Sequence, residues 1–188
     1  MRPWKTPIAR LPRRAALASG VAGALLAGTL VTARLVGIRV NDTASMPRGL
    51  WQISTVAAPL RRGEIVAVCL PNTTPIREAA VRGYIPAGNC SGGYEPLLKP
   101  VAAIAGDLVM VTPQGIAVDG EPIKNTAPLV RDSADRPLRP VPAGAYEVMP
   151  RQIWLLSGHD PRSFDSRYFG PVPAANVQDV ARPVWVLG

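Results

Sequence analysis

The sequence predicts a mostly β domain made of small curled sheets, preceded by one N-terminal transmembrane helix. An apolar run without charge covers residues 15–33, and helical periodicity is scarce after it. The remaining chain carries short apolar runs, and the 21 prolines and 17 glycines of the sequence provide the breaks between them. With 188 residues, the chain has room for one domain with a real core.

The leader has the order of an export signal. A basic segment, residues 1–14, precedes the apolar run, which would span about 28 Å as a helix, close to the hydrocarbon thickness of a bilayer. This predicts a retained anchor over residues 15–36, with a cleaved signal peptide as the alternative that the abundant alanine allows. The arginines before the run predict a cytoplasmic N-terminus, so residues 37–188 would form a periplasmic domain on the inner membrane.

The net charge of +8 does not indicate nucleic-acid binding, because the charge is unevenly distributed. The first 40 residues hold seven basic side chains and no acid, whereas 14 basic and 13 acidic side chains follow from Asn41 onward. The domain is therefore too balanced to track a phosphate backbone. We expect no nucleic-acid partner.

Two cysteines occur, Cys69 and Cys90, and both fall in the part expected to be exported. An oxidising compartment would allow them to pair, and a bridge closing a loop of roughly 20 residues would contribute about 3 kcal/mol. The alternative is a pair of free thiols. Since no metal-ligand spacing is present, we expect no metal site.

Five short apolar runs predict the strands of the domain, at residues 64–70, 97–104, 108–111, 116–118 and 153–156. Asp119-Gly120 predicts a hairpin turn between the fourth run and the strand-like residues 121–123. The proline- and glycine-rich stretches 71–94 and 125–145 are expected to be loops.

Ser45 is a candidate nucleophile, and two side chains could activate it. It follows the apolar run by about twelve residues, so it would lie near the membrane surface. The one histidine, His159, could form a triad with Asp160 or Asp165. The competing base is Lys99, which lies between apolar neighbours; if it faces inward, desolvation would lower its pKa by roughly three units and let it act as a neutral base. Without Ser45, Lys99 would read as a surface side chain of an edge strand.

Four blocks of sequence, in order, resemble the bacterial type I signal peptidases. S-M-P-R-G at residues 45–49 is similar to their nucleophile box, and L-L-K-P-V-A-A-I-A-G-D at 97–107 is similar to their lysine box. G-I-A-V-D-G-E-P-I at 115–123 resembles the hairpin that follows. The last block, L-S-G-H-D-P-R-S-F-D-S-R-Y-F-G-P-V at 156–172, matches the closing pattern S-x-D-S-R-x-x-G-x-V.

Within this family, the chain most resembles the conjugative-transfer peptidases of the TraF type. The features that carry this likeness are P-R-G-L-W after Ser45, the short hairpin region, G-H-D at residues 158–160 and G-Y-I-P-A-G-N-C at 83–90. The resemblance implies maturation of a conjugative pilin subunit and a family-specific loop closed by the disulfide. It also implies the family's antiparallel β fold.

The resemblance implies roles for the matching residues. Ser45 would be the nucleophile and Lys99 the base, while Thr43 would join the Ser45 backbone N–H in the oxyanion site. Around them, the resemblance assigns supporting roles to Ser163, which would orient Lys99, to the pair Asp165 and Arg167, and, with less support from the pattern, to His159. Met46 and Pro47 are expected to line the substrate groove. Pro100 cannot donate to a sheet ladder, which predicts an edge or a bulge beside Lys99.

The resemblance implies a leader-bearing precursor and the lipid bilayer as partners, with the conjugative transfer apparatus as a further one, and no cofactor. An extended substrate would add as a strand beside the lysine strand.

Several alternatives stay open at this point. A general preprotein signal peptidase would use the same chemistry, and a related variant would pass the acyl group to the substrate's own amine and release a cyclic product. A third alternative is not an enzyme: an anchored β domain that acts as a scaffold in an envelope complex. Self-cleaving repressors share the serine-lysine chemistry but carry a DNA-binding head where this chain has an apolar leader.

Overall fold

The computed structural model describes residues 23–25, 27–29, 31–32, 36–56 and 59–187. The chain divides into two units, Met1–Ile38 and Arg39–Gly188. Among the residues described, no helix combines the length and the apolar character that a membrane crossing requires. The predicted anchor over residues 15–36 falls largely outside the described residues, and so does the basic segment 1–14.

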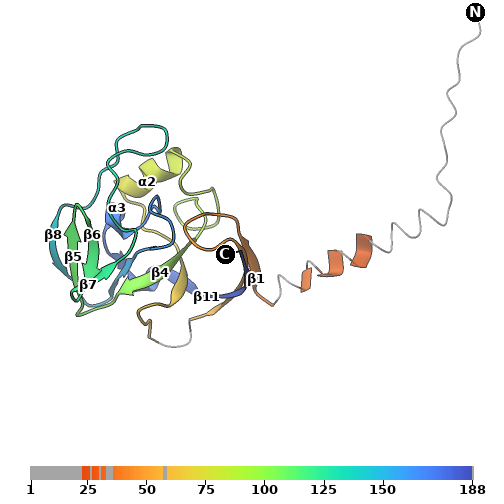
Figure 1. Cartoon of the computed structure of the whole chain (residues 1–188). Coiled ribbons are helices and arrows are strands. Elements are labelled where there is room, and N and C mark those ends of the chain that lie inside the picture. Colours follow the sequence, from red (N-terminus) through yellow and green to blue (C-terminus); the bar gives the residue numbers. More distant parts are fainter. Residues whose placement is uncertain (1–22, 26, 30, 33–35, 57–58, 188) are drawn as a thin grey trace, which may run out of the picture. The chain divides into compact units, whose positions relative to one another are not determined.

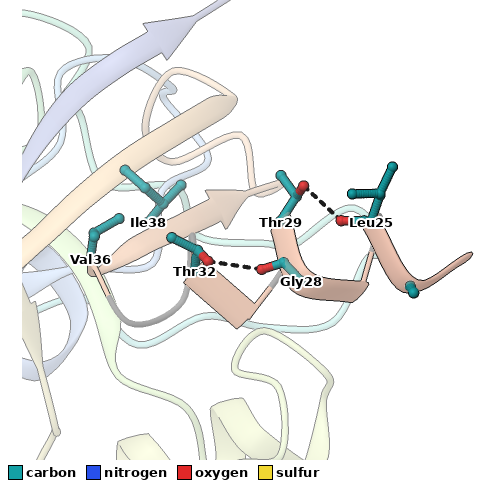
Figure 2. A pocket seen from close by; sticks show the side chains of 7 residues that line it. Leu25, Gly28, Thr29, Thr32, Val36 and Ile38 are labelled. Carbon is teal, nitrogen blue, oxygen red and sulfur yellow. Dashed lines mark hydrogen bonds between the residues drawn. The ribbon is translucent and has the colours of Figure 1, made fainter. Parts of the chain in front are cut away.

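The described residues between 23 and 32 are helical. The hydroxyls of the two threonines among them donate hydrogen bonds to backbone carbonyls of the same helix. Thr29 donates to the carbonyl oxygen of Leu25 at 2.9 Å, and Thr32 donates to that of Gly28 at 2.9 Å (Figure 2). Such bonds to the carbonyl four residues earlier leave no hydroxyl donor pointing outward without a partner. A helix with this sequence can therefore present an apolar surface despite its threonines.

The second unit is mostly β, as the sequence predicts (Figure 1). The larger sheet has the strand order β1-β2-β11-β3-β4-β9-β10, and the smaller has the order β7-β6-β5-β8. The larger sheet consists of β1 (Ile38–Asn41), β2 (Gly49–Thr55), β11 (Val177–Val186), β3 (Ile65–Val68), β4 (Leu97–Ala103), β9 (Gln152–Leu155) and β10 (Val172–Pro173). The smaller consists of β7 (Glu121–Ile123), β6 (Gly115–Val118), β5 (Leu108–Thr112) and β8 (Gly144–Glu147). Three short helical segments complete the unit: α2 (Thr74–Val81), α3 (Ser166–Phe169) and the 3-10 turn η1 (Ala174–Asn176).

The pairing from β2 through β11, β3, β4 and β9 to β10 is antiparallel, and so is the pairing within the smaller sheet. All five predicted apolar runs contain a strand, and the turn at Asp119-Gly120 has positive φ at both residues, 49° and 85°, as a two-residue hairpin requires. The hairpin prediction is confirmed.

Strand β9 separates two apolar cores. Ile153 and Leu155 belong to a cluster with Val101, α2 and the disulfide, whereas Trp154 and Leu156 belong to a second cluster with the smaller sheet. Because side chains alternate along a strand, both faces of β9 are buried. The segment that follows β9 therefore starts from a fixed position.

One loop prediction needs correction, and the expectation for Pro100 can be compared with the sheet order. The stretch 71–94 is not wholly loop, because it contains α2, which has a proline in its first turn and buries Ile76 and Ala79. That proline is a helix-start signal that the loop prediction overlooked. The expectation of an edge or a bulge beside Lys99 agrees with the structure in its second form. β4 is an inner strand between β3 and β9, and its pairing with β9 shifts register between Val101 and Ala103.

Candidate active site

Lys99 lies on β4 with its side chain directed into the protein. Side chains alternate along the strand, and Lys99 lies on the same face as the buried Val101 and Ala103. Only 2% of Lys99 is exposed. Its Nζ donates a hydrogen bond to the Ser163 hydroxyl at 2.8 Å. Burial lowers the pKa of Lys99 from 10.5 to about 8, because the charged amine loses hydration there.

Neighbouring charges modify this shift but do not cause it. Asp165 and Asp160 raise the pKa of Lys99 by attracting its positive charge, and Arg167 lowers it by repulsion. These influences oppose one another, so desolvation decides the direction. The sequence-based expectation of an inward lysine with a lowered pKa is confirmed.

The turn at residues 160–163 holds the partner of Lys99. The carbonyl oxygen of Asp160 accepts a hydrogen bond from the Ser163 backbone N–H at 3.0 Å, and its carboxylate accepts one from the Arg162 N–H at 2.7 Å. Ser163 itself is 2% exposed. The turn therefore fixes a buried hydroxyl against the lysine amine.

Asp165 and Arg167 form a fully buried ion pair behind this turn. The Nε of Arg167 donates to Asp165 at 2.7 Å and one Nη2 hydrogen donates to the other carboxylate oxygen at 2.8 Å. The remaining donors of Arg167 reach three backbone carbonyls, those of Asn125, Pro161 and Ser157. All five guanidinium donors thus have an acceptor, which a buried arginine needs.

Ser45 lies in the turn between β1 and β2, and the Asn41 side chain organises this turn. The Asn41 amide nitrogen donates to the carbonyl oxygens of Thr43, Met46 and Pro47, each at 3.1 Å. The Trp51 indole adds a bond to the Pro47 carbonyl at 3.1 Å. Ser45 is half-buried in this turn.

The turn that holds Ser45 and the strand that holds Lys99 meet in one apolar cluster. Met46, 5% exposed, forms its centre with Trp51 and Ala181, and Leu98 packs against it beside Lys99. The turn also contacts residues 156–172, the last of the four sequence blocks, because the Ser157 hydroxyl donates to the backbone carbonyl of Ser45. The structure thus brings together the segments that carry Ser45, Lys99 and Ser163.

Other predicted site residues have different surroundings. Thr43 is exposed, and its hydroxyl donates to the Asn41 amide oxygen at 2.8 Å. His159 is exposed, and in the described part of the chain its imidazole makes no hydrogen bond, although its backbone N–H donates to Ser157 at 3.3 Å. Met46 belongs to the core, whereas Pro47 is half-buried. Lys99 is thus buried with a lowered pKa, whereas His159 is exposed and has no hydrogen-bonded acid among the described residues.

The predicted disulfide is confirmed. Cys69 and Cys90 are bonded, with their Cα atoms 5.5 Å apart and 21 positions apart in sequence. Cys69 directly follows β3, the strand that pairs with Lys99's strand, and Cys90 lies in the loop after α2. The bridge therefore ties this loop to the sheet that carries the lysine.

Sequence reasoning missed Asn41 and Ser157. Asn41 carries a recognisable signal, since an asparagine two residues before a threonine in N-D-T forms the turn in which its side chain binds the backbone two positions on; here the Thr43 N–H donates to the Asn41 oxygen at 3.3 Å. Ser157 has no such signal, because its partner Ser45 lies 112 positions away.

Comparisons with known proteins give a consistent picture. Residues 13–186 match the family described as signal peptidase, peptidase S26. A probable conjugal transfer protein TraF of Sinorhizobium fredii is 41% identical over 157 residues, which cover 84% of this chain and 81% of that protein. A plasmid transfer protein TraF of Escherichia coli is 40% identical over 166 residues, covering 88% of this chain and 90% of that protein. A signal peptidase I structure from Enterococcus faecalis matches with a TM-score of 0.37 at 20% identity, over 65% of this chain and 97% of that one.

Proposed function

Since this chain belongs to the signal peptidase family, peptidase S26, we propose that it is a membrane-anchored serine endopeptidase that removes leader peptides through Ser45 and Lys99. The observation that carries the proposal is the buried lysine: an amine with a pKa of about 8, hydrogen-bonded to Ser163, is equipped to accept a proton near neutral pH. Such a base is what a serine hydroxyl needs to become a nucleophile.

In the proposed reaction, the Ser45 hydroxyl oxygen attacks the scissile carbonyl carbon and Lys99 accepts the hydroxyl proton. The C–N bond then breaks, the leaving amine takes the proton from Lys99, and an ester joins Ser45 to the upstream part of the substrate. A water molecule that gives a proton to Lys99 cleaves this ester and restores Ser45. Thr43, which donates to Asn41 in this structure, would exchange that acceptor for the oxyanion.

The substrate would bind as an added strand beside Lys99. Leu97, Leu98 and Lys99 pair with β3 on one side, whereas β9 pairs with β4 only at Val101 and Ala103, so among the described residues no strand covers the other side of this segment. An extended peptide could take up these backbone groups and bring its scissile bond past the lysine. Pro47, half-buried beside Ser45, would line this groove with Met46 beneath it.

The conjugative-transfer names of the relatives support a pilin precursor as the substrate. The proposed setting is the inner membrane, with residues 15–36 as a single-pass anchor, residues 1–14 in the cytoplasm and residues 37–188 in the periplasm. The arginines before residue 15 support this orientation. The Cys69–Cys90 bond supports an oxidising compartment for the domain.

Co-expression with candidate pilin precursors tests the proposed function. The parent should shorten a precursor, while Ser45→Ala and Lys99→Ala should leave it at full mass, because one variant lacks the nucleophile and the other lacks the base. Intact-mass measurement of the precursor reads the result, and a product lighter than the hydrolysed form by one water would reveal cyclisation. Processing that survives both substitutions would refute the dyad.

The pH dependence of the purified enzyme should follow Lys99. Since only the neutral amine can accept a proton, kcat/KM is expected to rise about tenfold per pH unit below pH 8 and to level off above it. A fluorogenic peptide with an Ala-x-Ala segment, the pattern of leader cleavage sites, serves as substrate. A half-maximum more than one unit below pH 8 would contradict Lys99 as the base.

A further inference from the structure

Ser157 connects two parts of the site that lie far apart in sequence. It lies two positions after the last residue of β9, Leu155, and is completely buried. Its backbone N–H donates to Asp165 at 3.0 Å, and its backbone carbonyl accepts from Arg167 at 2.9 Å. The main chain of Ser157 is therefore held on both sides by the buried ion pair.

The side chain of Ser157 carries this fixed position to the nucleophile. Its hydroxyl donates to the backbone carbonyl of Ser45 and accepts the His159 N–H. Asn41 binds the carbonyls of Thr43, Met46 and Pro47, which flank Ser45, but within the described residues the hydrogen bond that reaches Ser45 itself comes from Ser157. Because the ψ angle relates the carbonyl of a residue to its Cα–Cβ bond, this hydrogen bond restricts the direction of the Cα–Cβ bond of Ser45.

We propose that Ser157 is a positioning residue for Ser45, through which the Asp165–Arg167 pair fixes the direction of the nucleophile. This inference rests on the proposed function. The same ion pair also holds the turn of Ser163, since Arg167 donates to the Pro161 carbonyl in that turn at 2.9 Å, and Ser163 accepts the hydrogen bond of the lysine amine. One buried pair thus supports both the base, through Ser163, and the nucleophile, through Ser157.

The test compares Ser157→Ala with Ser157→Thr in the full chain, held in detergent micelles and supplied with the Ala-x-Ala peptide. Ser157→Ala should lower kcat about tenfold to a hundredfold, the range expected when a reacting group is misplaced. The pH of half-maximal kcat/KM should stay at the parent value, because Ser157 makes no hydrogen bond to Lys99 among the described residues. KM should change less than kcat, because Ser157 reaches the proposed groove only from beneath, at the Met46 sulfur. Ser157→Thr keeps the hydroxyl and should retain kcat within about threefold.

Thr126→Val is the matched control. Thr126 is also buried, and its hydroxyl accepts from the Ile116 N–H at 2.9 Å and donates to the Ile123 carbonyl at 2.6 Å, both outside the site. Both Thr126→Val and Ser157→Ala remove the hydrogen bonds of a buried hydroxyl, so both should lower Tm. Only Ser157→Ala should lower kcat per folded molecule. If Ser157→Ala does not fold, Ser157→Cys replaces it: a thiol is a weak donor, so kcat should still fall several-fold.

The outcomes separate this inference from the proposed function. A parent-like kcat in Ser157→Ala or Ser157→Cys, with Ser45→Ala inactive, overturns the positioning role alone, and so does an equal loss of kcat in Ser157→Thr and Ser157→Ala. Activity that persists in Ser45→Ala overturns the proposed function first. A fall in kcat confined to the variants that weaken the hydroxyl donor supports the role of Ser157.

Discussion

Lys99→Met should lose at least about a thousandfold in kcat, within the contribution of a positioned general base, and become more stable at neutral pH. The two effects have one physical origin. The buried amine is useful because desolvation favours its neutral form, and the same desolvation destabilises the folded protein whenever the amine is protonated. Methionine has a similar length and carries no charge, so it removes both the base and this cost.

The sign and pH range of the stability change follow from the pKa of Lys99. At pH 7 the lysine is mostly protonated in the folded state and fully so in the unfolded state, and the shift from 10.5 to about 8 corresponds to a folding cost of about 3 kcal/mol. The cost diminishes as pH rises above 8, because the unfolded state then binds more protons than the folded one, and it vanishes above about 10.5. Some of the gain is offset because Ser163 loses its partner.

Thermal unfolding at pH 7 and pH 10, together with peptide cleavage, checks this prediction. We expect Lys99→Met to raise Tm at pH 7 and to raise it less at pH 10, with activity lost at both. Ser45→Ala provides the comparison, since it should lose activity without the pH-dependent gain in Tm. A Lys99→Met protein that keeps parent activity, or one whose Tm falls more at pH 7 than at pH 10, would contradict the role of the buried amine.

Arg167→Lys should destabilise the protein by about 2–6 kcal/mol, because at least two buried acceptors lose their donor at about 1–3 kcal/mol each. Arg167 is completely buried, and its five donors reach Asp165 and three backbone carbonyls. A lysine keeps the positive charge but has only three donors on one nitrogen and cannot reproduce the planar fork, so at least two of the five hydrogen bonds would be lost. Activity should fall with stability, because Asp165 and Arg167 hold both Ser163's segment and Ser157.

Urea unfolding measures this loss. Arg131→Lys is the matched control, since Arg131 forms an exposed ion pair with Asp135 and its replacement should cost less than about 0.5 kcal/mol. The double substitution of Asp165 by Leu and Arg167 by Met should cost less than the two single substitutions together, because no unpaired charge stays buried. Equal, small losses for Arg167→Lys and Arg131→Lys would show that the buried pair contributes little.

Much of the fold could be anticipated from local pattern. The five apolar runs each contain a strand, because alternation and flanking breakers are properties of neighbouring residues. The hairpin at Asp119-Gly120 was predictable for the same reason. The long central strand β11 was not predicted, since Arg182 and Pro183 interrupt its apolar pattern; it pairs with β2 and β3, and its register with β2 shifts after Pro183. α2 was missed because its few apolar positions lie among loop-forming residues.

The sequence by itself determined the residue types of the proposed chemistry, the mostly β class and the family of this protein, because motifs and strand patterns are written in neighbouring positions. Only the tertiary structure decided that Lys99 is buried against Ser163 and that His159 faces solvent. It also decided that all five donors of Arg167 have an acceptor and that Ser157 donates to the carbonyl of Ser45. Those relations join residues up to 112 positions apart, and burial, the cause of the lowered lysine pKa, arises only when distant strands pack together.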